Sequence, residues 1–210
     1  MSPTLGTFVL TGANGGLGRA IVAQFLSRPE SSDYKGLWGV RDPAKAADLL
    51  QILNRIPHSA ERHPVVKIDI GTLKNVRAAA ADINERVASG ALPPIRVLVL
   101  NAAVQFVTGQ MYTDEGLEST FAVNYVANFL LAALLMQSID KDMGRIVIIS
   151  SWTHDPPHPL NGHIVADEHY TIFRDSLETL ARPAKDQKDD EYNSGMRRYG
   201  ASKTLIIMIM

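Results

Sequence analysis

The chain has 210 residues, enough for one domain with a sizeable core. Its 21 basic and 22 acidic residues nearly cancel, so charge gives no reason to expect nucleic acid or an anionic membrane as a partner. The absence of cysteine excludes disulfides and thiolate metal sites, and we expect a cytoplasmic protein. The longest apolar stretch, residues 121–136, is interrupted by Asn124 and Asn128, so we expect a buried helix and no membrane span.

Short runs rich in leucine and β-branched residues alternate with helical patterns through the first two-thirds of the chain. Strands are expected at residues 7–10, 37–40, 65–68, 95–100 and 145–149. Helices are expected at residues 17–27, 43–53, 73–88 and 115–137. Asp42 and Pro43 mark the start of the second helix, as N-cap and first-turn residue. This alternation predicts an α/β fold, a doubly wound parallel sheet of the Rossmann dinucleotide-binding type, as a single domain over residues 1–210.

A glycine-rich turn, TGANGGLG at residues 11–18, follows the first expected strand and opens the first helix. Glycines at such a turn let the backbone approach a pyrophosphate closely, and the helix N terminus offers free N–H groups. A turn of this kind can also serve structure alone, but a strand before it and an amphipathic helix after it favour cofactor binding. The candidate cofactor-binding residues of this turn are Thr11, Gly12, Asn14, Gly16, Leu17 and Gly18.

Further candidate cofactor contacts stand where the next three strands end, the edge at which open parallel sheets bind ligands. An acidic residue after the second strand would favour NAD, whereas Arg41 is placed to pair with a 2′-phosphate. The sequence therefore favours NADP(H) over NAD(H). The alternative is an exposed Arg41 beside Asp42 acting only as a helix cap. The remaining candidates, after the third and fourth strands, are Asp69, Ile70, Asn101, Ala102 and Ala103.

Four candidate catalytic residues occur in the second half of the chain. Asn124 lies in the long expected helix. The alternative to a catalytic role is a polar side chain inside the helix whose hydrogen bonds are satisfied by a neighbour. Ser151 follows the fifth strand, with Ser150 as the second choice. Tyr199 and Lys203 are four residues apart, which places them on one face of a helix. A neighbouring ammonium and an oxidised nicotinamide ring should both lower the pKa of a tyrosine from its usual value of about 10.

In their order and spacing these motifs resemble those of the short-chain dehydrogenase/reductase family, although Asn-Ala-Ala at residues 101–103 replaces the family's Asn-Ala-Gly. The resemblance implies an enzyme that interconverts a carbonyl and an alcohol on a small organic substrate with NADP(H). It implies that Tyr199 exchanges the proton with the substrate and that Lys203 adjusts the pKa of the Tyr199 phenol. Both residues would also contact the cofactor. It further implies that Ser151 orients the substrate oxygen and that Asn124 holds a water in a proton relay.

Residues 152–198 depart from the usual family pattern, because they put 48 positions between Ser151 and Tyr199 (199 − 151). The segment is rich in proline, histidine and charge, and one helix is expected near residues 172–180. Its form resembles a subgroup that includes protochlorophyllide and retinol reductases. We expect this insertion to border the substrate pocket.

Four histidines lie close together in the insertion: His154, His158, His163 and His169. Their spacings of four, five and six residues do not keep them on one helical face. We therefore expect loop histidines at a pocket and no metal site.

The sequence continues for only seven residues after Lys203, whereas family members run on into further strands and helices. We expect those C-terminal elements to be missing from this chain. This leaves an alternative to an active oxidoreductase: a cofactor-binding regulator or a catalytically defective truncated paralogue. The same Tyr/Lys pair could also serve a lyase or epimerase of the family. A homo-oligomer is a further alternative, since family members associate through a dimer-forming surface.

Overall fold

The computed structural model describes residues 4–56, 59–162, 176–186, 188 and 190–209. The chain forms two compact units. The first unit comprises Met1–Ala102 and Leu130–Ile149, and the second comprises Ala103–Phe129 and Ser150–Met210. The expectation of one domain over residues 1–210 stays a prediction.

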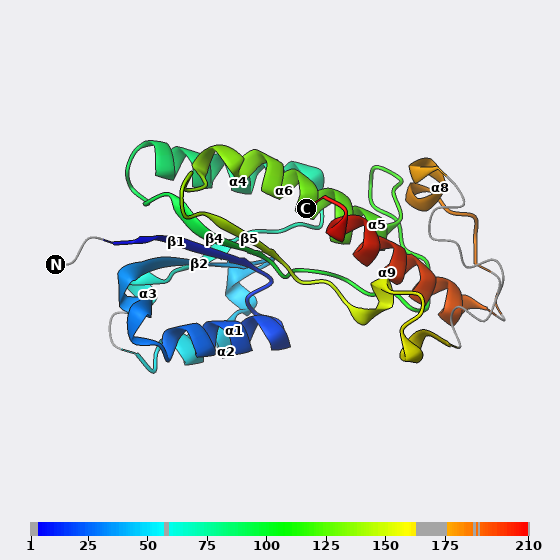
Figure 1. The fold of residues 1–210 in the computed structure, drawn as a ribbon, viewed down its shortest axis with the longest axis horizontal. Helices are drawn as coiled ribbons and strands as arrows, with labels where there is room; N and C mark the ends of the chain where they lie inside the picture. Colours follow the sequence, from blue (N-terminus) through cyan, green and yellow to red (C-terminus); the bar gives the residue numbers. More distant parts are fainter. Residues whose placement is uncertain (1–3, 57–58, 163–175, 187, 189, 210) are drawn as a thin grey trace. The chain divides into compact units, whose positions relative to one another are not determined.

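The first unit is built on a five-stranded parallel sheet with the strand order β3-β2-β1-β4-β5 (Figure 1). Its strands are β1 (Gly6–Thr11), β2 (Tyr34–Val40), β3 (Val65–Lys67), β4 (Ile95–Leu100) and β5 (Arg145–Ile148). All five predicted strands are therefore found, each within three residues of its expected bounds. The order reverses between β1 and β4, the switch point at which doubly wound sheets bind ligands. The predicted α/β class is confirmed.

Helices lie on both faces of this sheet (Figure 1). On one face are α1 (Gly16–Leu26) and α2 (Ala47–Leu53), and on the other are α4 (Leu73–Ala88) and α6 (Asn128–Leu135). The short remaining helices of this unit are η1 (Pro29–Asp33), η2 (Pro43–Lys45), α3 (Ser59–Arg62) and η4 (Met136–Ser138). The helix expected at residues 43–53 is divided, because its first turn is the 3₁₀ helix η2.

An apolar core fills the space between the sheet and α1 with α2. Leu10, Trp38 and Leu49 have no exposed surface, and Trp38 meets the ring of Phe8 edge-on with 5.5 Å between centroids. Burying side chains of this size stabilises the fold by about 1.5–3 kcal/mol each. This core supports the glycine turn that links β1 to α1.

The second unit is mostly helical in its described part. Its elements are α5 (Ser119–Phe121), the π-helical turn η3 (Ala122–Ala127), η5 (Trp152–His154), η6 (Pro159–Asn161), α8 (Leu177–Ala181) and α9 (Glu191–Ile207). The side chain of Asn128 donates to the carbonyls of Val123 (3.0 Å) and Asn124 (3.2 Å). These bonds hold the side chain of Asn128 against the π turn.

Two helix predictions in the second unit need correction. The helix expected from residue 115 begins at Ser119, because Gly116 has φ 74° and Tyr112 pairs with Glu118 in an antiparallel bridge. The helix expected at residues 172–180 lies partly outside the described residues, which contain α8 (Leu177–Ala181) there.

One helical stretch, Ser119–Ser138, is long and apolar enough to cross a membrane, with a mean hydropathy of 1.6. The structure buries 56% of it, and Asn124 and Asn128 are 1% and 3% exposed. A core helix meets the same criteria of length and composition, so the stretch is weak support for a membrane span.

Candidate functional site

The glycine turn of the first unit is held to the end of β4 by a set of hydrogen bonds. The hydroxyl of Thr11 accepts from the backbone N–H groups of Asn101 and Ala102, both at 3.0 Å. The side-chain amide of Asn101 donates to the carbonyls of Thr11 (2.9 Å) and Gly12 (3.2 Å). The predicted residues Thr11, Asn101 and Ala102 therefore act together and fix the shape of the turn.

Two glycines of the turn are required by close packing. Gly12 has φ 67°, and a Cβ there would lie 2.9 Å from the Cα of Ala102. A Cβ at Gly18 would collide with the carbonyl oxygen of Gly12 and lie 2.8 Å from the Cα of Ala13. By contrast, a Cβ at Gly16 would meet nothing within 4 Å. The turn is thus tight at Gly12 and Gly18 and open at Gly16.

The open part of the turn coincides with the N terminus of α1. Gly15 is the N-cap residue and provides no side-chain cap, while Gly15, Gly16 and Leu17 are exposed. The first N–H groups of a helix have no partner within the helix, and its N terminus carries a partial positive charge. This arrangement fits a phosphate group, so the residues present are suited to the pyrophosphate of a dinucleotide.

The residues after β2 form the corner at which the sequence predicts a contact with a 2′-phosphate. Arg41 is exposed, and the carboxylate of Asp42 accepts from the N–H of Ala44 at 3.1 Å, which confirms the predicted N-cap. The ammonium of Lys45 lies 3.9 Å from the same carboxylate. Asn14 donates to the carbonyl of Lys45 at 2.9 Å, which connects the glycine turn to this corner.

The candidates after β3 have local partners of their own. The carboxylate of Asp69 accepts from the N–H of Gly71 at 2.9 Å and from the side chain of Asn75 at 2.8 Å. Ile70 is 6% exposed, so its side chain belongs to the core, whereas Ala103 is exposed and falls in the second unit. Asp69 orders the turn before α4, and its predicted contact with the cofactor stays a prediction.

In the second unit the structure brings Ser151, Tyr199 and Lys203 together. The side chain of Ser151 lies close enough to the phenol of Tyr199 to act on its pKa as a hydrogen-bond partner. The ammonium of Lys203 lies 5.6 Å from the centroid of the tyrosine ring, one turn along α9. The hydroxyl of Ser150 instead donates to the backbone carbonyl of Lys203 at 3.2 Å. Of the two serines considered from the sequence, Ser151 is the one that reaches the phenol.

Burial dominates the protonation of this pair. It raises the pKa of Tyr199 above its usual value, and the hydrogen bond from Ser151 offsets only part of that rise. The expectation that Lys203 and an oxidised nicotinamide ring together lower the pKa of the phenol stays a prediction. Burial also lowers the pKa of Lys203 to about 8, since its side chain is almost entirely removed from water. Both groups are thus shifted toward their neutral forms.

Asn124 is buried in the π turn, and its side chain is fully engaged. Its amide oxygen accepts from the N–H of Val104 at 2.8 Å, and its amide nitrogen donates to the carbonyl of Val104 at 2.8 Å. The amide nitrogen also lies 3.0 Å from the hydroxyl of Ser202, which donates to the carbonyl of Tyr199 at 2.7 Å. These contacts match the alternative of a polar group satisfied by neighbours, and the predicted water relay stays a prediction.

Ser202 is a site residue that the sequence reasoning missed. It lies between Tyr199 and Lys203 in the motif, and its hydroxyl connects Asn124 to the backbone of α9. A small polar residue directly before the lysine is the only signal that could have pointed to it. Because the two residues are 78 positions apart, their contact is not visible in the sequence.

No group of three or more histidine, aspartate and glutamate side chains that could hold a metal occurs in the described residues. His154 and His158 are described, whereas His163 and His169 lie outside the described residues. The expectation of no metal site therefore stays a prediction.

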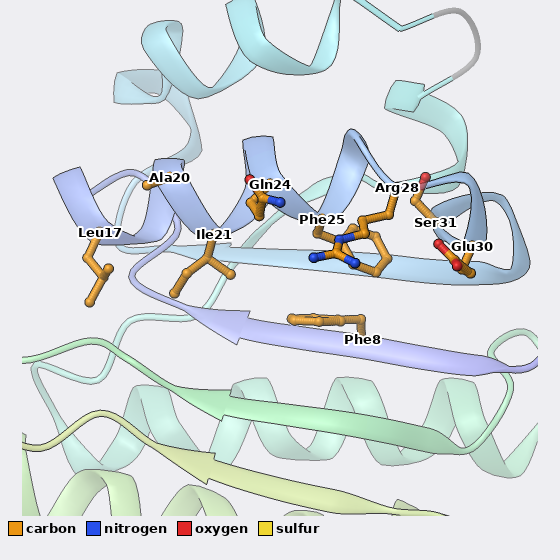
Figure 2. Close-up of a pocket in the computed structure, with 9 residues that line it drawn as sticks. All are labelled: Phe8, Leu17, Ala20, Ile21, Gln24, Phe25, Arg28, Glu30 and Ser31. Carbon is orange, nitrogen blue, oxygen red and sulfur yellow. The ribbon is translucent and has the colours of Figure 1, made fainter.

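The first unit also has a cavity of about 560 Å³ along α1. Figure 2 shows Leu17 and Ile21 pointing from α1 toward the side of β1, where Phe8 lies, with Arg28 and Glu30 at the other end of the cavity. Its lining is mainly apolar, and of the predicted cofactor residues only Leu17 contributes to it.

Comparison with known proteins identifies the family. A family profile described as short chain dehydrogenase matches residues 7–162. The chain is 39% identical to the short-chain dehydrogenase iccH of Talaromyces variabilis, over 97% of this chain and 62% of the relative. It is 32% identical to human retinol dehydrogenase 14, over 69% of this chain and 44% of the relative. The chain thus spans less than two-thirds of the length of these relatives.

A solved structure agrees on the fold. The NADPH-bound carbonyl reductase from chicken fatty liver superposes with a TM-score of 0.63 over 99% of this chain and 71% of that chain, at 19% sequence identity. At this identity the likeness concerns the fold alone, and the fold is the same parallel sheet with helices on both faces. The profile match and the identity to relatives confirm the resemblance inferred from the motifs: the chain belongs to the short-chain dehydrogenase/reductase family.

Proposed function

We propose that this chain is an NADP(H)-dependent oxidoreductase that interconverts a carbonyl and an alcohol on a small organic substrate, with Tyr199 as general acid and base. One observation carries the proposal: the half-buried phenol of Tyr199 is within reach of the Ser151 side chain and lies one helical turn from the buried Lys203. Relatives named short-chain dehydrogenase and retinol dehydrogenase support the same reaction class.

The turn at residues 11–18 would hold the cofactor through the exposed N terminus of α1. When bound, the dinucleotide supplies hydride to the substrate carbon or accepts it. The hydroxyl of Ser151 then orients the substrate oxygen by a hydrogen bond, and the phenol of Tyr199 gives that oxygen a proton as carbonyl becomes alcohol. Burial keeps the phenol protonated at neutral pH, which suits this direction. Lys203, with a pKa of about 8, carries positive charge at pH 7 and stabilises the phenolate that remains.

The direct test is the substitution Tyr199→Phe, measured by NADPH oxidation with a panel of aldehydes and ketones. We expect turnover to fall by about 10²–10⁴-fold, because the proton donor is lost, while NADPH affinity stays within about twofold. Ser151→Ala should also lower turnover, whereas Ser150→Ala serves as its neighbouring control. NADPH binding without turnover on any carbonyl would favour the regulator, and product formation without net NADPH consumption would favour the lyase or epimerase.

The corner after β2 supports a preference for NADP(H). Arg41 is exposed there, and the carboxylate of Asp42 is already engaged by the N–H of Ala44. A charge-assisted contact with a 2′-phosphate contributes about 1.5–3 kcal/mol, so Arg41→Ala should weaken NADPH binding by about 10–100-fold and leave NADH binding unchanged. Arg28→Ala, at the far end of α1, is the matched control. Equal affinity of the unaltered chain for the two cofactors would refute the preference.

The insertion at residues 152–198 is proposed to border the substrate pocket. Trp152 directly follows Ser151, and the carbonyl of His154 accepts from the hydroxyl of Thr204 on α9 at 3.1 Å. Hydrogen exchange of residues 152–162 should slow when a turned-over carbonyl substrate is added, and unchanged exchange would contradict the proposal. We further propose that the protein is cytoplasmic and can form homo-oligomers. Sedimentation velocity would test the oligomeric state in solution.

A further inference from the structure

Arg198 directly precedes Tyr199 on α9, and its guanidinium is buried between two carboxylates. Its side chain is 10% exposed, as is that of Asp186. Its Nη1 lies 2.5 and 2.6 Å from the two carboxylate oxygens of Asp186, and its Nε lies 3.6 Å from Oε1 of Glu118. Buried ion pairs contribute little net stability because desolvation offsets their attraction, but removing one partner is strongly unfavourable. The cluster therefore fixes where Arg198 can lie.

Glu118 connects the cluster of Arg198, Asp186 and Glu118 to the helical stretch that contains Asn124. Its side chain has no exposed surface. Its Oε2 accepts from the N–H of Phe121 at 2.8 Å, and its Oε1 accepts from the hydroxyl of Thr120 at 2.9 Å. Glu118 is thus the N-cap of α5, and Arg198 is attached to the point where the helix begins.

A second contact between α9 and the helix of Asn124 lies one turn further along α9. Ser202, four residues after Arg198 and so on the same face, is hydrogen-bonded to Asn124 at 3.0 Å. Leu205 belongs to the same buried apolar cluster as Phe121. Tyr199 directly follows Arg198, and Lys203 directly follows Ser202. The contacts of Arg198 and Ser202 therefore set the rotation of α9 about its own axis, and with it the direction of the phenol.

We propose that Arg198 is a positioning residue, whose ion pairs with Glu118 and Asp186 hold α9 at the rotation that aligns the Tyr199 phenol with Ser151. The inference rests on the proposed role of Tyr199 as general acid. A phenol oxygen lies about 9 Å from the helix axis, so a rotation of about 10° moves it by about 1.5 Å. A misplacement of about 1 Å can lower a rate by about 10²-fold.

Asp186 extends this alignment to the chain that leads into α9. Its backbone N–H donates to the side chain of Gln110 at 3.2 Å, and the two residues line a cavity of about 280 Å³. The amide of Gln110 donates in turn to the carbonyl of Ala184 at 3.0 Å. The orientation of Tyr199 thus depends on the folding of the last part of the insertion.

The experiment compares Arg198→Met with Arg197→Met. Arg197 is the adjacent residue of α9 and is also ion-paired, but with Asp190 and partly exposed, so it is a matched control. We expect Arg198→Met to lower kcat for carbonyl reduction by about 10²-fold, with KM and NADPH affinity within about threefold. Arg198→Lys should recover part of the loss, since one ammonium restores the charge without the planar fork. A kcat for Arg198→Met equal to that of Arg197→Met would overturn the inference.

Arg198→Met leaves two buried carboxylates without their partner, so a second variant guards against unfolding. The triple variant Arg198→Met, Glu118→Gln, Asp186→Asn removes all three charges. It should fold and still show the loss of kcat, and full activity of the folded triple variant would also refute the positioning role.

A spectroscopic readout separates this inference from the proposed function. In protein labelled with ¹³Cζ-tyrosine, Ser151→Ala should shift the Tyr199 signal, because the hydrogen bond to the phenol is lost. In the Arg198→Met and triple backgrounds the same substitution should have little effect, since that contact is already broken. If Ser151→Ala shifts the signal equally in every background, the inference fails. If the unaltered chain reduces no carbonyl while the contact proves Arg198-dependent, the proposed function fails and the positioning stands.

Discussion

Replacing Gly16 and Gly18 in turn by alanine tests whether the turn at residues 11–18 is built for packing, for a cofactor, or for both. At Gly18 the added methyl would collide with the carbonyl of Gly12 and lie 2.8 Å from the Cα of Ala13. Both obstacles are backbone atoms, so they cannot turn away as a flexible side chain would. At Gly16 the methyl would meet nothing within 4 Å.

The two positions should therefore give opposite effects on stability. Overpacking of this kind costs about 1–3 kcal/mol, and a chain of this size loses about 2–4 °C of Tm per kcal/mol, so Gly18→Ala should lower Tm by about 2–12 °C. Gly16→Ala should leave Tm unchanged or raise it, because alanine is up to about 1 kcal/mol better than glycine in a helix. If a pyrophosphate approaches the backbone at Gly16, the same methyl should weaken NADPH binding by about 5–150-fold.

Thermal unfolding by circular dichroism and NADPH titration by fluorescence, on the same preparations, separate the two effects. Gly16→Ala serves as the control for folding, and Gly18→Ala as the control for a general loss of binding through a distorted turn. A stable Gly16→Ala variant that binds NADPH as tightly as the unaltered chain would refute the assignment of the open part of the turn to the cofactor. A Gly18→Ala variant with unchanged Tm would refute the packing argument.

Two further predictions concern buried titratable groups. Burial and the nearby cations Arg62 and Lys35 lower the pKa of His63 from 6.5 to about 4, so the unfolded chain binds the extra proton first as the pH falls. The contribution of neutral His63 to the free energy of unfolding should be fully present above about pH 6.5, and the free energy of unfolding should decrease by up to about 3 kcal/mol toward pH 4. Urea unfolding at a series of pH values measures this decrease. A His63→Phe variant that does not show it would support the assignment to His63. Burial lowers the pKa of Lys203 from 10.5 to about 8, so its ammonium destabilises the fold at pH 7, and Lys203→Met should gain up to about 3 kcal/mol there while losing turnover. That gain should fade above about pH 10.5, where the lysine is neutral in both states, and a Lys203→Met variant less stable at pH 7 would contradict this account.

Most of the sheet could be predicted because its signal is local. Runs such as residues 95–100 are apolar, short and β-branched, which distinguishes strands buried on both faces from helices. The N-cap at Asp42 was equally visible, since aspartate followed by proline favours one local geometry. The helix start near residue 115 was placed too early, because hydrophobic periodicity does not reveal that Gly116 adopts a positive φ and closes a turn.

The candidate site was predictable in its residues more than in its contacts. The order of the motifs identified Ser151, Tyr199 and Lys203, and the structure brings them together. The sign of the pKa shift of Tyr199 was not predictable, because it depends on how deeply α9 is buried and not on the spacing of tyrosine and lysine. The partners of Asn124 were hidden for a related reason, since Ser202 is far away in the sequence.

What holds the candidate catalytic groups in place differs from what holds the sheet. Among the described residues, the buried cluster around Leu10 and Trp38 has ten members, whereas the cluster around Phe121 in the second unit has three. A small apolar cluster gives little resistance to the rotation of a helix such as α9, because apolar contacts have no preferred direction. Directional contacts must supply that resistance, and the hydrogen bonds of Arg198 to Asp186 do so next to Tyr199, with the ion pair to Glu118 beside them. Substitutions that strengthen the core around Trp38 should accordingly stabilise the sheet without improving the alignment of the phenol.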